Sequence, residues 1–245
     1  MSDAQGSTTL ERSEPQVSTA STLIDIFFEP GKVFEALRAR PRFLVAGLIL
    51  LALTCIMTFV LFMRVDMGQV IRERMERSPN AAQQSEAQRE MGIKIGKIGA
   101  AVFIPLSVPI TIALGAALYL LGVLAFGGTI NYKRALAVWT YSSLPQSVLA
   151  VIIGIAVLLL KSPDTVDPQR LLVTNPGAFM GEDASPVLVA LLSQFDVLRF
   201  YGMFLAALGL RKVGKLSSGA AWTIVIGLWL IGALFLVGRA ALFGR

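Results

Sequence analysis

The sequence predicts an all-α polytopic membrane protein, in which a transmembrane bundle of five helices follows an amphipathic interfacial helix. Only 16% of the 245 residues are charged, whereas a soluble domain carries about 25%. The charged residues leave five long gaps along the chain; four contain no charge and one contains only Asp196 and Arg199. About 20 apolar helical residues cross a bilayer core about 30 Å thick, so gaps of this length indicate membrane spans. The expected spans cover residues 43–63, 98–126, 135–160, 187–210 and 216–238 of a membrane domain that extends over 43–245.

The composition excludes several kinds of chemistry. The chain has no histidine and a single cysteine, Cys55, inside the first expected span. Histidine-ligated metals, Ser-His-Asp triads and intrachain disulfides are therefore ruled out. A nucleotide-binding loop of the G-x-x-x-x-G-K-[ST] type is absent, and an aspartyl protease needs two intramembrane carboxylates where only Asp196 is available. We expect no catalytic, cofactor or metal site, and we expect Cys55 to be a small buried hydrophobic residue.

The N-terminal segment is expected to have two parts. Residues 1–22 form a polar, Ser/Thr-rich tail without the features of a cleavable signal peptide. Residues 23–42 alternate bulky apolar residues with charged ones in a pattern typical of an amphipathic helix. Lying flat on the membrane, this helix would insert its phenylalanines into the acyl boundary and turn its arginines toward anionic lipid; alternatively, it is a lead-in that packs on the bundle. The expected interfacial residues are Phe27, Phe28, Pro30, Phe34, Arg38, Arg40 and Arg42.

The connector between the first two spans predicts a helical hairpin that projects from the bilayer. The helical pattern of the first span continues until Ser78-Pro79-Asn80, and a second helix restarts near Ala81 or Ser85. This connector is the largest polar surface of the protein, so it is either a docking site for a partner or a solvated link. In the second span, Pro105 and Pro109 predict a bend that neighbouring helices accommodate.

The third and fourth spans each leave two alternatives open. The third is either one crossing kinked at Pro145 or an interfacial helix over 133–143 with a shorter crossing, and aromatic residues beside a basic pair favour the second version slightly. The fourth carries Asp196 and Arg199 on one helix face, where charges at the bilayer centre are expected to pair. Alternatively, this element breaks near Ser193 or Asp196, and Asp196 caps a crossing that starts there.

Polar residues within the bundle are the candidate functional positions. A small cavity lined by such residues would suit a solute pathway, whereas pairing or capping would make them structural. The small residues of Gly92-xxx-Gly96 and Gly202-xxx-Ala206, by contrast, resemble motifs at which two membrane helices pack closely. The candidate cavity residues are Asp196, Arg199, Asn131, Gln146 and Gln194.

The order of these features resembles the Yip-domain family over residues 23–238. The resemblance rests on the lead-in FFEPGKVFEAL, on the Y-x-x-x-P element from Tyr141 to Pro145 after a basic turn, and on FDVLRFYGMFLAALGL before the last span. The family implies five membrane helices with a cytosolic N-terminus, and its eukaryotic members are linked to Rab-type GTPases. The Asp-Leu-Tyr-Gly-Pro motif of those members is missing here and the polar tail is short, so the chain resembles the prokaryotic branch. A bacterial inner (plasma) membrane is implied, and a Rab-type GTPase partner is not expected.

Two functions follow from the sequence. The leading hypothesis is a non-enzymatic integral membrane protein that organises the membrane or binds partners. The expected partners are the lipid bilayer and either other membrane proteins or a second copy of this chain. Nucleic acid is not an expected partner. The alternative is a small-solute transporter or channel component that uses Asp196 and Arg199. Compact basic turns and the acidic 161–185 loop favour a cytoplasmic N-terminus and an outside C-terminus. The basic residues of the 64–97 connector oppose that orientation.

Overall fold

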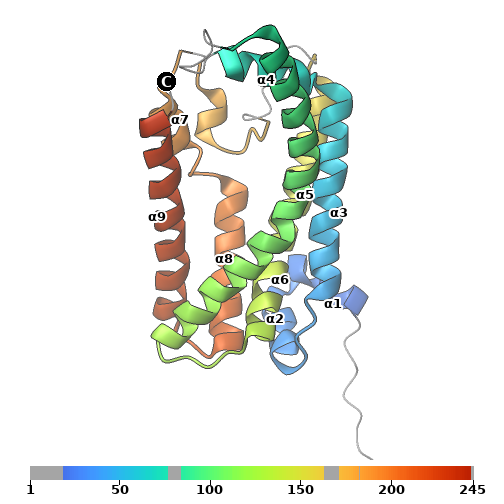
Figure 1. Ribbon diagram of the computed structural model, residues 1–245. Coiled ribbons are helices and arrows are strands. Elements are labelled where there is room, and N and C mark those ends of the chain that lie inside the picture. Colours follow the sequence, from blue (N-terminus) through green and yellow to red (C-terminus); the bar gives the residue numbers. More distant parts are fainter. Residues whose placement is uncertain (1–18, 77–83, 163–170, 182, 244–245) are drawn as a thin grey trace, which may run out of the picture.

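A computed structural model describes residues 19–76, 84–162, 171–181 and 183–243, and it contains helices and no strand within these ranges. The long helices stand side by side in one bundle (Figure 1). Four of them are long and apolar enough to cross a membrane, and a bent pair completes a fifth crossing when it is taken as one span. The predicted all-α transmembrane bundle is confirmed, because each stretch without charge folds as a helix whose backbone groups bond internally.

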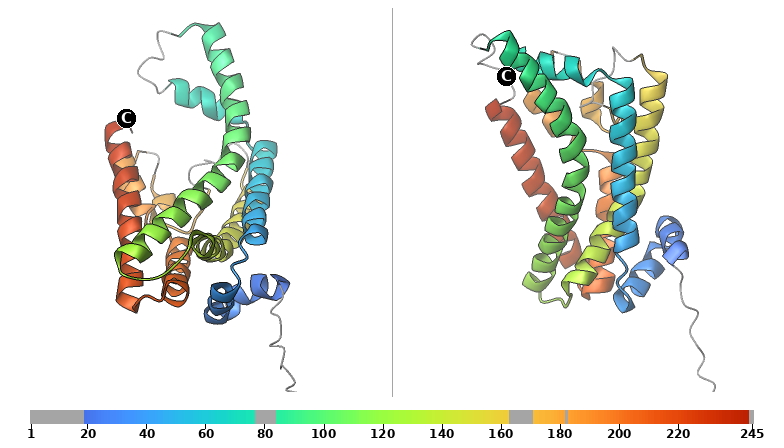
Figure 2. Two further views of the ribbon diagram at one scale, coloured as in Figure 1. Left: turned by 60° about the horizontal axis from the view of Figure 1, so that its bottom comes forward. Right: turned by 45° about the vertical axis from the view of Figure 1, so that its right-hand side comes forward.

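Two short helices, α1 (Thr19–Phe28) and α2 (Pro30–Ala39), lie under one end of the bundle (Figure 2). Pro30 occupies the first turn of α2, where its missing N–H costs nothing. The apolar face of α2 packs on the bundle against α8, so Phe34 is completely buried and does not reach the acyl boundary as expected. Phe28, by contrast, is 79% exposed on the outside of α1.

The helix α3 (Leu44–Arg64) is followed by α4 (Met67–Glu76) and by α5 (Glu86–Ala125). The 40 residues of α5 extend over about 60 Å, twice the thickness of a bilayer core. Its first turns project past α3, and α4 folds back against them (Figure 1). The expected helical hairpin is therefore present, although the expected stop at Ser78-Pro79-Asn80 lies outside the described residues.

Small residues bring the two arms of this hairpin together. A Cβ atom added at Gly92 would lie 2.8 Å from Cε of Met75, and one added at Gly96 would lie 3.1 Å from Cδ1 of Ile71. Side chains at these two glycines would push α4 away from α5. The Gly92-xxx-Gly96 motif thus packs helices, as its sequence predicted.

The third crossing is one continuous helix, α6 (Tyr132–Leu160), so the slightly favoured division at residue 143 is wrong. Pro145 removes one backbone bond from α6, but the helix continues because α3, α5 and α8 surround it. The aromatic pair does not mark the headgroup layer. Tyr141 is completely buried, and the ring of Trp139 lies 4.9 Å from that of Tyr119 on α5.

The fourth crossing is broken into α7 (Pro186–Leu192) and α8 (Val197–Gly214), which meet at 46°, and α9 (Ser218–Phe243) follows. The turns from α5 to α6 and from α8 to α9 lie at the same end of the bundle as α1 and α2 (Figure 1). The α4–α5 hairpin, α7 and the end of α9 lie at the opposite end, as expected for an odd number of crossings.

The main hydrophobic core occupies the end of the bundle next to α1 and α2. It combines side chains from these two helices with the adjacent halves of α3, α5, α6, α8 and α9. A second, smaller cluster of Val65, Leu158 and Leu171 lies toward the opposite end. Cys55 belongs to neither cluster and is exposed on α3, which contradicts its expected burial, because no other part of the described chain covers that side of α3.

Candidate functional site

Asp196 lies in the break between α7 and α8 and caps the first turn of α8. Its Oδ1 atom accepts hydrogen bonds from the backbone N–H of Leu198 at 2.8 Å and from that of Arg199 at 3.2 Å. A helix leaves its first N–H groups without partners inside the helix, and an aspartate at this position satisfies two of them. Of the two alternatives for the fourth crossing, the broken element with a capping aspartate is therefore found.

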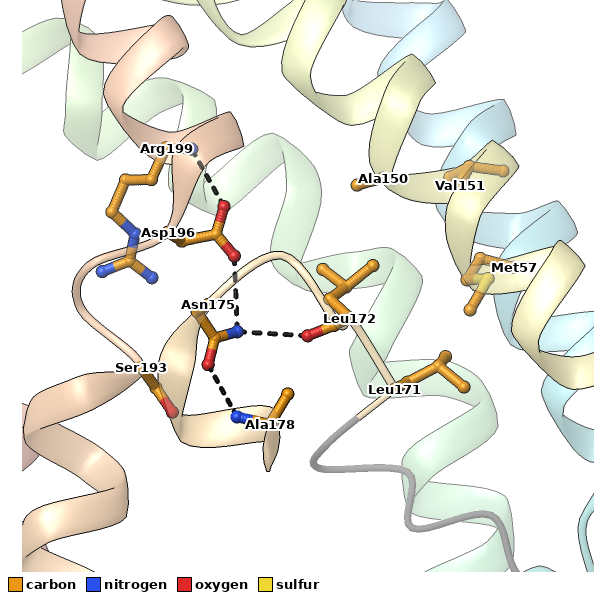
Figure 3. Close-up of a pocket in the computed structure, with 10 residues that line it drawn as sticks. All are labelled: Met57, Ala150, Val151, Leu171, Leu172, Asn175, Ala178, Ser193, Asp196 and Arg199. Atoms are coloured by element: carbon orange, nitrogen blue, oxygen red, sulfur yellow. Dashed lines mark hydrogen bonds between the residues drawn. The ribbon is translucent and has the colours of Figure 1, made fainter. Parts of the chain in front are cut away.

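The second carboxylate oxygen of Asp196 binds a segment that precedes α7. Oδ2 accepts from the Thr174 hydroxyl at 2.6 Å. It also accepts from the Asn175 amide at 3.4 Å (Figure 3). The backbone N–H of Val197 also donates to the carbonyl of Thr174 at 3.2 Å. Asp196 is only 8% exposed, so this nearly buried carboxylate joins the 171–181 segment to the start of α8.

The short 3₁₀ helix η3 (Pro176–Phe179) holds this segment against α7. The side chain of Asn175 caps η3 by accepting from Ala178 N at 3.1 Å. Gly177 lies so close to α7 that an added Cβ would be 2.8 Å from the Val189 carbonyl and would overlap the Ser193 hydroxyl. A glycine is therefore required for η3 to reach the break.

Arg199 does not pair with Asp196. Its guanidinium donates to the side-chain carbonyl of Gln194 and points away from the Asp196 carboxylate (Figure 3). Gln194 is itself buried, and its backbone carbonyl accepts from the indole of Trp229 on α9 at 3.4 Å. The prediction of an ion pair between Asp196 and Arg199 is wrong. The bend between α7 and α8 makes Asp196 the N-cap of α8, and Arg199 binds Gln194 instead.

A cavity of about 360 Å³ opens beside Asp196. Its polar wall is formed by the 171–181 segment and the α7–α8 break, and its apolar wall by α3 and α6 (Figure 3). Met57 belongs to α3, and Ala150 and Val151 belong to α6, so the cavity reaches the helices of the bundle. The lining residues are Met57, Ala150, Val151, Leu171, Leu172, Asn175, Ala178, Ser193, Asp196 and Arg199.

The other candidate residues lie away from this cavity. Asn131 caps α6 by accepting from Arg134 N at 2.9 Å. The side chain of Gln146 packs directly against Gly202 of α8. A side chain at position 202 would overlap the amide group of Gln146. Pro145 and Tyr141 are buried in α6, and the Tyr141 hydroxyl has no hydrogen-bond partner among the described residues. The expected polar cavity thus contains Asp196 and Arg199 but not Asn131 or Gln146.

The sequence did not predict that Thr174 and Asn175 bind the Asp196 carboxylate. Asn175 precedes Pro176 and Gly177, a combination typical of a turn, so the sequence signals a local bend there. It carries no signal that this turn meets Asp196, 21 residues later. Only the folding of the loop into the bundle brings the two together.

Basic residues surround the end of the bundle that holds α1 and α2. Arg42 donates to the Thr19 hydroxyl at 3.0 Å, and Arg134 donates to the Arg38 carbonyl at 2.9 Å. Lys212 on α8 forms an ion pair with Glu35 on α2. The hydrogen bond and the positive charge of Lys212 lower the pKa of Glu35. These contacts hold the N-terminal helices on the bundle.

Comparison with known proteins agrees with this architecture. The chain matches the family model of the Yip1 domain over residues 24–239. It is similar to the membrane protein YknW of Bacillus subtilis (strain 168), with 23% identity over 237 residues that cover 93% of this chain and 95% of that protein. No solved structure matches the chain. The resemblance predicted from the sequence is therefore confirmed, and the chain belongs to the Yip1-domain family.

Proposed function

We propose that this protein is a non-enzymatic scaffold of a bacterial inner membrane, and that it binds another integral membrane protein through the projecting part of α5. One observation carries the proposal. Four apolar residues form a stripe along one face of α5, and all are more than half exposed. We call them the α5 stripe: Met91 (59%), Ile95 (63%), Ile98 (58%) and Val102 (54%). Their spacing of four, three and four residues places them on one helix face.

The α5 stripe starts outside the membrane span. Lys97 lies 3.4 Å from the carboxylate of Asp66, the residue between α3 and α4, so this ion pair marks the end of the crossing. Met91 lies six residues further out, which is about 9 Å along the helix. Exposed apolar side chains beyond the bilayer core indicate an interaction site when they continue one contiguous face. The stripe also continues inward through Val102, so its partner must cross the headgroup layer as α5 does.

A second candidate function is transport of a small solute through the cavity beside Asp196. The size and mixed lining of this cavity favour it. Against it, all the hydrogen bonds of the Asp196 carboxylate serve to hold the protein together. A solute that left the cavity toward α1 and α2 would also have to pass the packed core around Val138, Tyr141 and Leu210. These contacts support the scaffold over the transporter.

The double variant Met91→Gln/Ile95→Gln tests the scaffold. The full chain and its variants are purified from cells in mild detergent, and the size and composition of each complex are measured. We expect the wild type to retain a membrane-protein partner and the double variant to lose it. The control is Glu90→Gln, which changes an exposed residue at the same height of α5 that lies about 100° around the helix from Met91, and it is expected to retain the partner.

The outcomes of this experiment are distinct. Equal retention by the wild type and the double variant would contradict the proposal. If two differently tagged copies of the wild type copurify and the double variant abolishes this, the partner is a second copy of this chain. Transport would be favoured instead if the wild type is monomeric and if cells take up a solute and lose this uptake with Asp196→Asn.

The same proposal places the N-terminus in the cytoplasm. Its support is the basic end of the bundle, where α1, α2 and the two short turns lie together, since such turns are typically cytoplasmic. A reporter fused to the N-terminus should be inaccessible from outside intact cells, and one fused to the C-terminus should be accessible. An accessible N-terminal reporter would reverse the orientation.

A further inference from the structure

A second hollow of the molecule is an apolar groove of about 270 Å³ on the outer surface of the bundle. We call it the α3/α6 groove. It lies between the start of α3, the middle of α5 and the first half of α6. These parts of the helices are near the end of the bundle that holds α1 and α2. Its walls are apolar, apart from the hydroxyl of Thr140. That hydroxyl donates back to the Leu136 carbonyl of its own helix at 2.9 Å, so it offers nothing to a ligand.

The α3/α6 groove extends over about two thirds of the depth of one leaflet. It follows α3 from Leu44 to Leu51, seven residues that extend over about 10 Å. One leaflet of a bilayer core about 30 Å thick is about 15 Å deep. A helix about 10 Å across would occupy about 800 Å³ over the same length, far more than the groove provides. The groove therefore suits an acyl chain better than a partner helix.

Positive charge lies at the headgroup end of this groove. Lys133 precedes the lining residues Leu136 and Thr140 by three and seven positions on α6, so all three share one helix face. Side chains of a helix lean toward its N-terminus, which directs Lys133 out of the groove toward the headgroups. Lys133 is exposed and forms no ion pair within the part of the chain that the structure describes. Arg42 adds a second positive charge next to the lining residue Phe43.

From this arrangement we infer that the α3/α6 groove binds one acyl chain of an anionic phospholipid, with the phosphate held by Lys133. The hydroxyl of Tyr132 donates to the carbonyl of Ala113, a groove residue, at 3.0 Å and closes the side of the groove. An apolar slot with basic residues at its membrane-interface end is complementary to such a lipid in both shape and charge. This binding is independent of the α5 stripe, because no residue is shared.

The experiment titrates the purified, delipidated full chain in detergent with phosphatidylglycerol and with phosphatidylcholine of the same acyl chains. Native mass spectrometry reports the apparent Kd for each lipid. We expect phosphatidylglycerol to bind more tightly, and Lys133→Gln to weaken it about fivefold, the effect of one basic residue at the membrane surface. The matched control is Lys161→Gln at the other end of α6, also exposed, which is expected to leave the Kd unchanged.

A second variant tests the acyl chain separately. A Cβ added at Gly47 would lie 3.7 Å from Cδ1 of Ile112 and 3.9 Å from Cγ2 of Thr140, which is ordinary van der Waals contact, so we expect the side chain of Gly47→Leu to extend into the groove. We expect it to weaken both lipids at least fivefold. The control Gly227→Leu adds the same side chain on α9, where no atom lies within 4 Å, and should change neither. Equal affinity for both lipids in the wild type, an equal effect of Lys161→Gln, or unchanged binding by Gly47→Leu would each overturn the inference.

Discussion

Asp196→Ala is expected to lower the free energy of unfolding by about 3 kcal/mol. Loss of an N-cap side chain costs about 0.5–2 kcal/mol. The substitution also removes the acceptor of the partly buried Thr174 hydroxyl and one acceptor of the Asn175 amide, at about 1 kcal/mol. For a chain of this size, each kcal/mol corresponds to about 2–4 °C. Thermal unfolding in detergent, followed by circular dichroism, should therefore show a midpoint lower by about 6–12 °C.

The variant Asp196→Asn separates the cap from the charge. Asparagine is as good an N-cap as aspartate, and its side-chain oxygen can still accept from Leu198 N and Arg199 N. The Thr174 hydroxyl can rotate to accept from the new amide, so we expect a loss of only about 1 kcal/mol. An Asp196→Ala protein as stable as the wild type would contradict the capping role. An Asp196→Asn protein as unstable as Asp196→Ala would show that the charge, not the cap, is what the fold needs.

Gly115→Ala is expected to lower the free energy of unfolding by about 2–3 kcal/mol. Gly115 is buried where α5 crosses α6, and an added Cβ would overlap the ring of Trp139. The indole cannot move away freely, because Tyr119 lies against it with ring centroids 4.9 Å apart. Overpacking of this kind costs about 1–3 kcal/mol. Loss of the contact between α5 and α6 should also change the fluorescence of Trp139.

The control for this prediction is Gly227→Ala. Gly227 lies inside α9, and an added Cβ would meet no atom within 4 Å. The same methyl group is therefore added without a clash, and alanine is the better helix former. We expect the midpoint of thermal unfolding to stay at or above that of the wild type. A similar loss of stability in both variants would show that glycine is needed for a reason other than packing.

The sequence predicted the helices better than the directions in which their side chains point. The spans follow from gaps between charges, a property of consecutive residues. Phe34 shows what such a pattern misses: it lies on an apolar helix face, but the pattern does not say whether lipid or α8 covers that face. Cys55 was misplaced for the same reason, since an apolar position in a membrane span suits the core and lipid equally.

The site at Asp196 also has features that the sequence predicted and features that it did not. Asp196 was predicted to be a pairing or capping residue because a lone carboxylate in an apolar stretch must be compensated, and the cap follows from the break that precedes it. Its bonds to Thr174 and Asn175 were not predicted. Those residues lie in the acidic 161–185 loop, and a loop of turn-forming residues has no periodicity that shows where it will pack.

The sequence alone determined that this protein spans a membrane with several helices, and which stretches of the chain contain them. Charge in lipid is so costly that its absence along the chain defines a span without reference to any other residue. The tertiary structure alone decided which apolar faces meet protein and which meet lipid, that α6 continues through Pro145, and that Asp196 binds a loop instead of Arg199. These outcomes depend on contacts between residues far apart in the chain, and a local pattern contains no record of them.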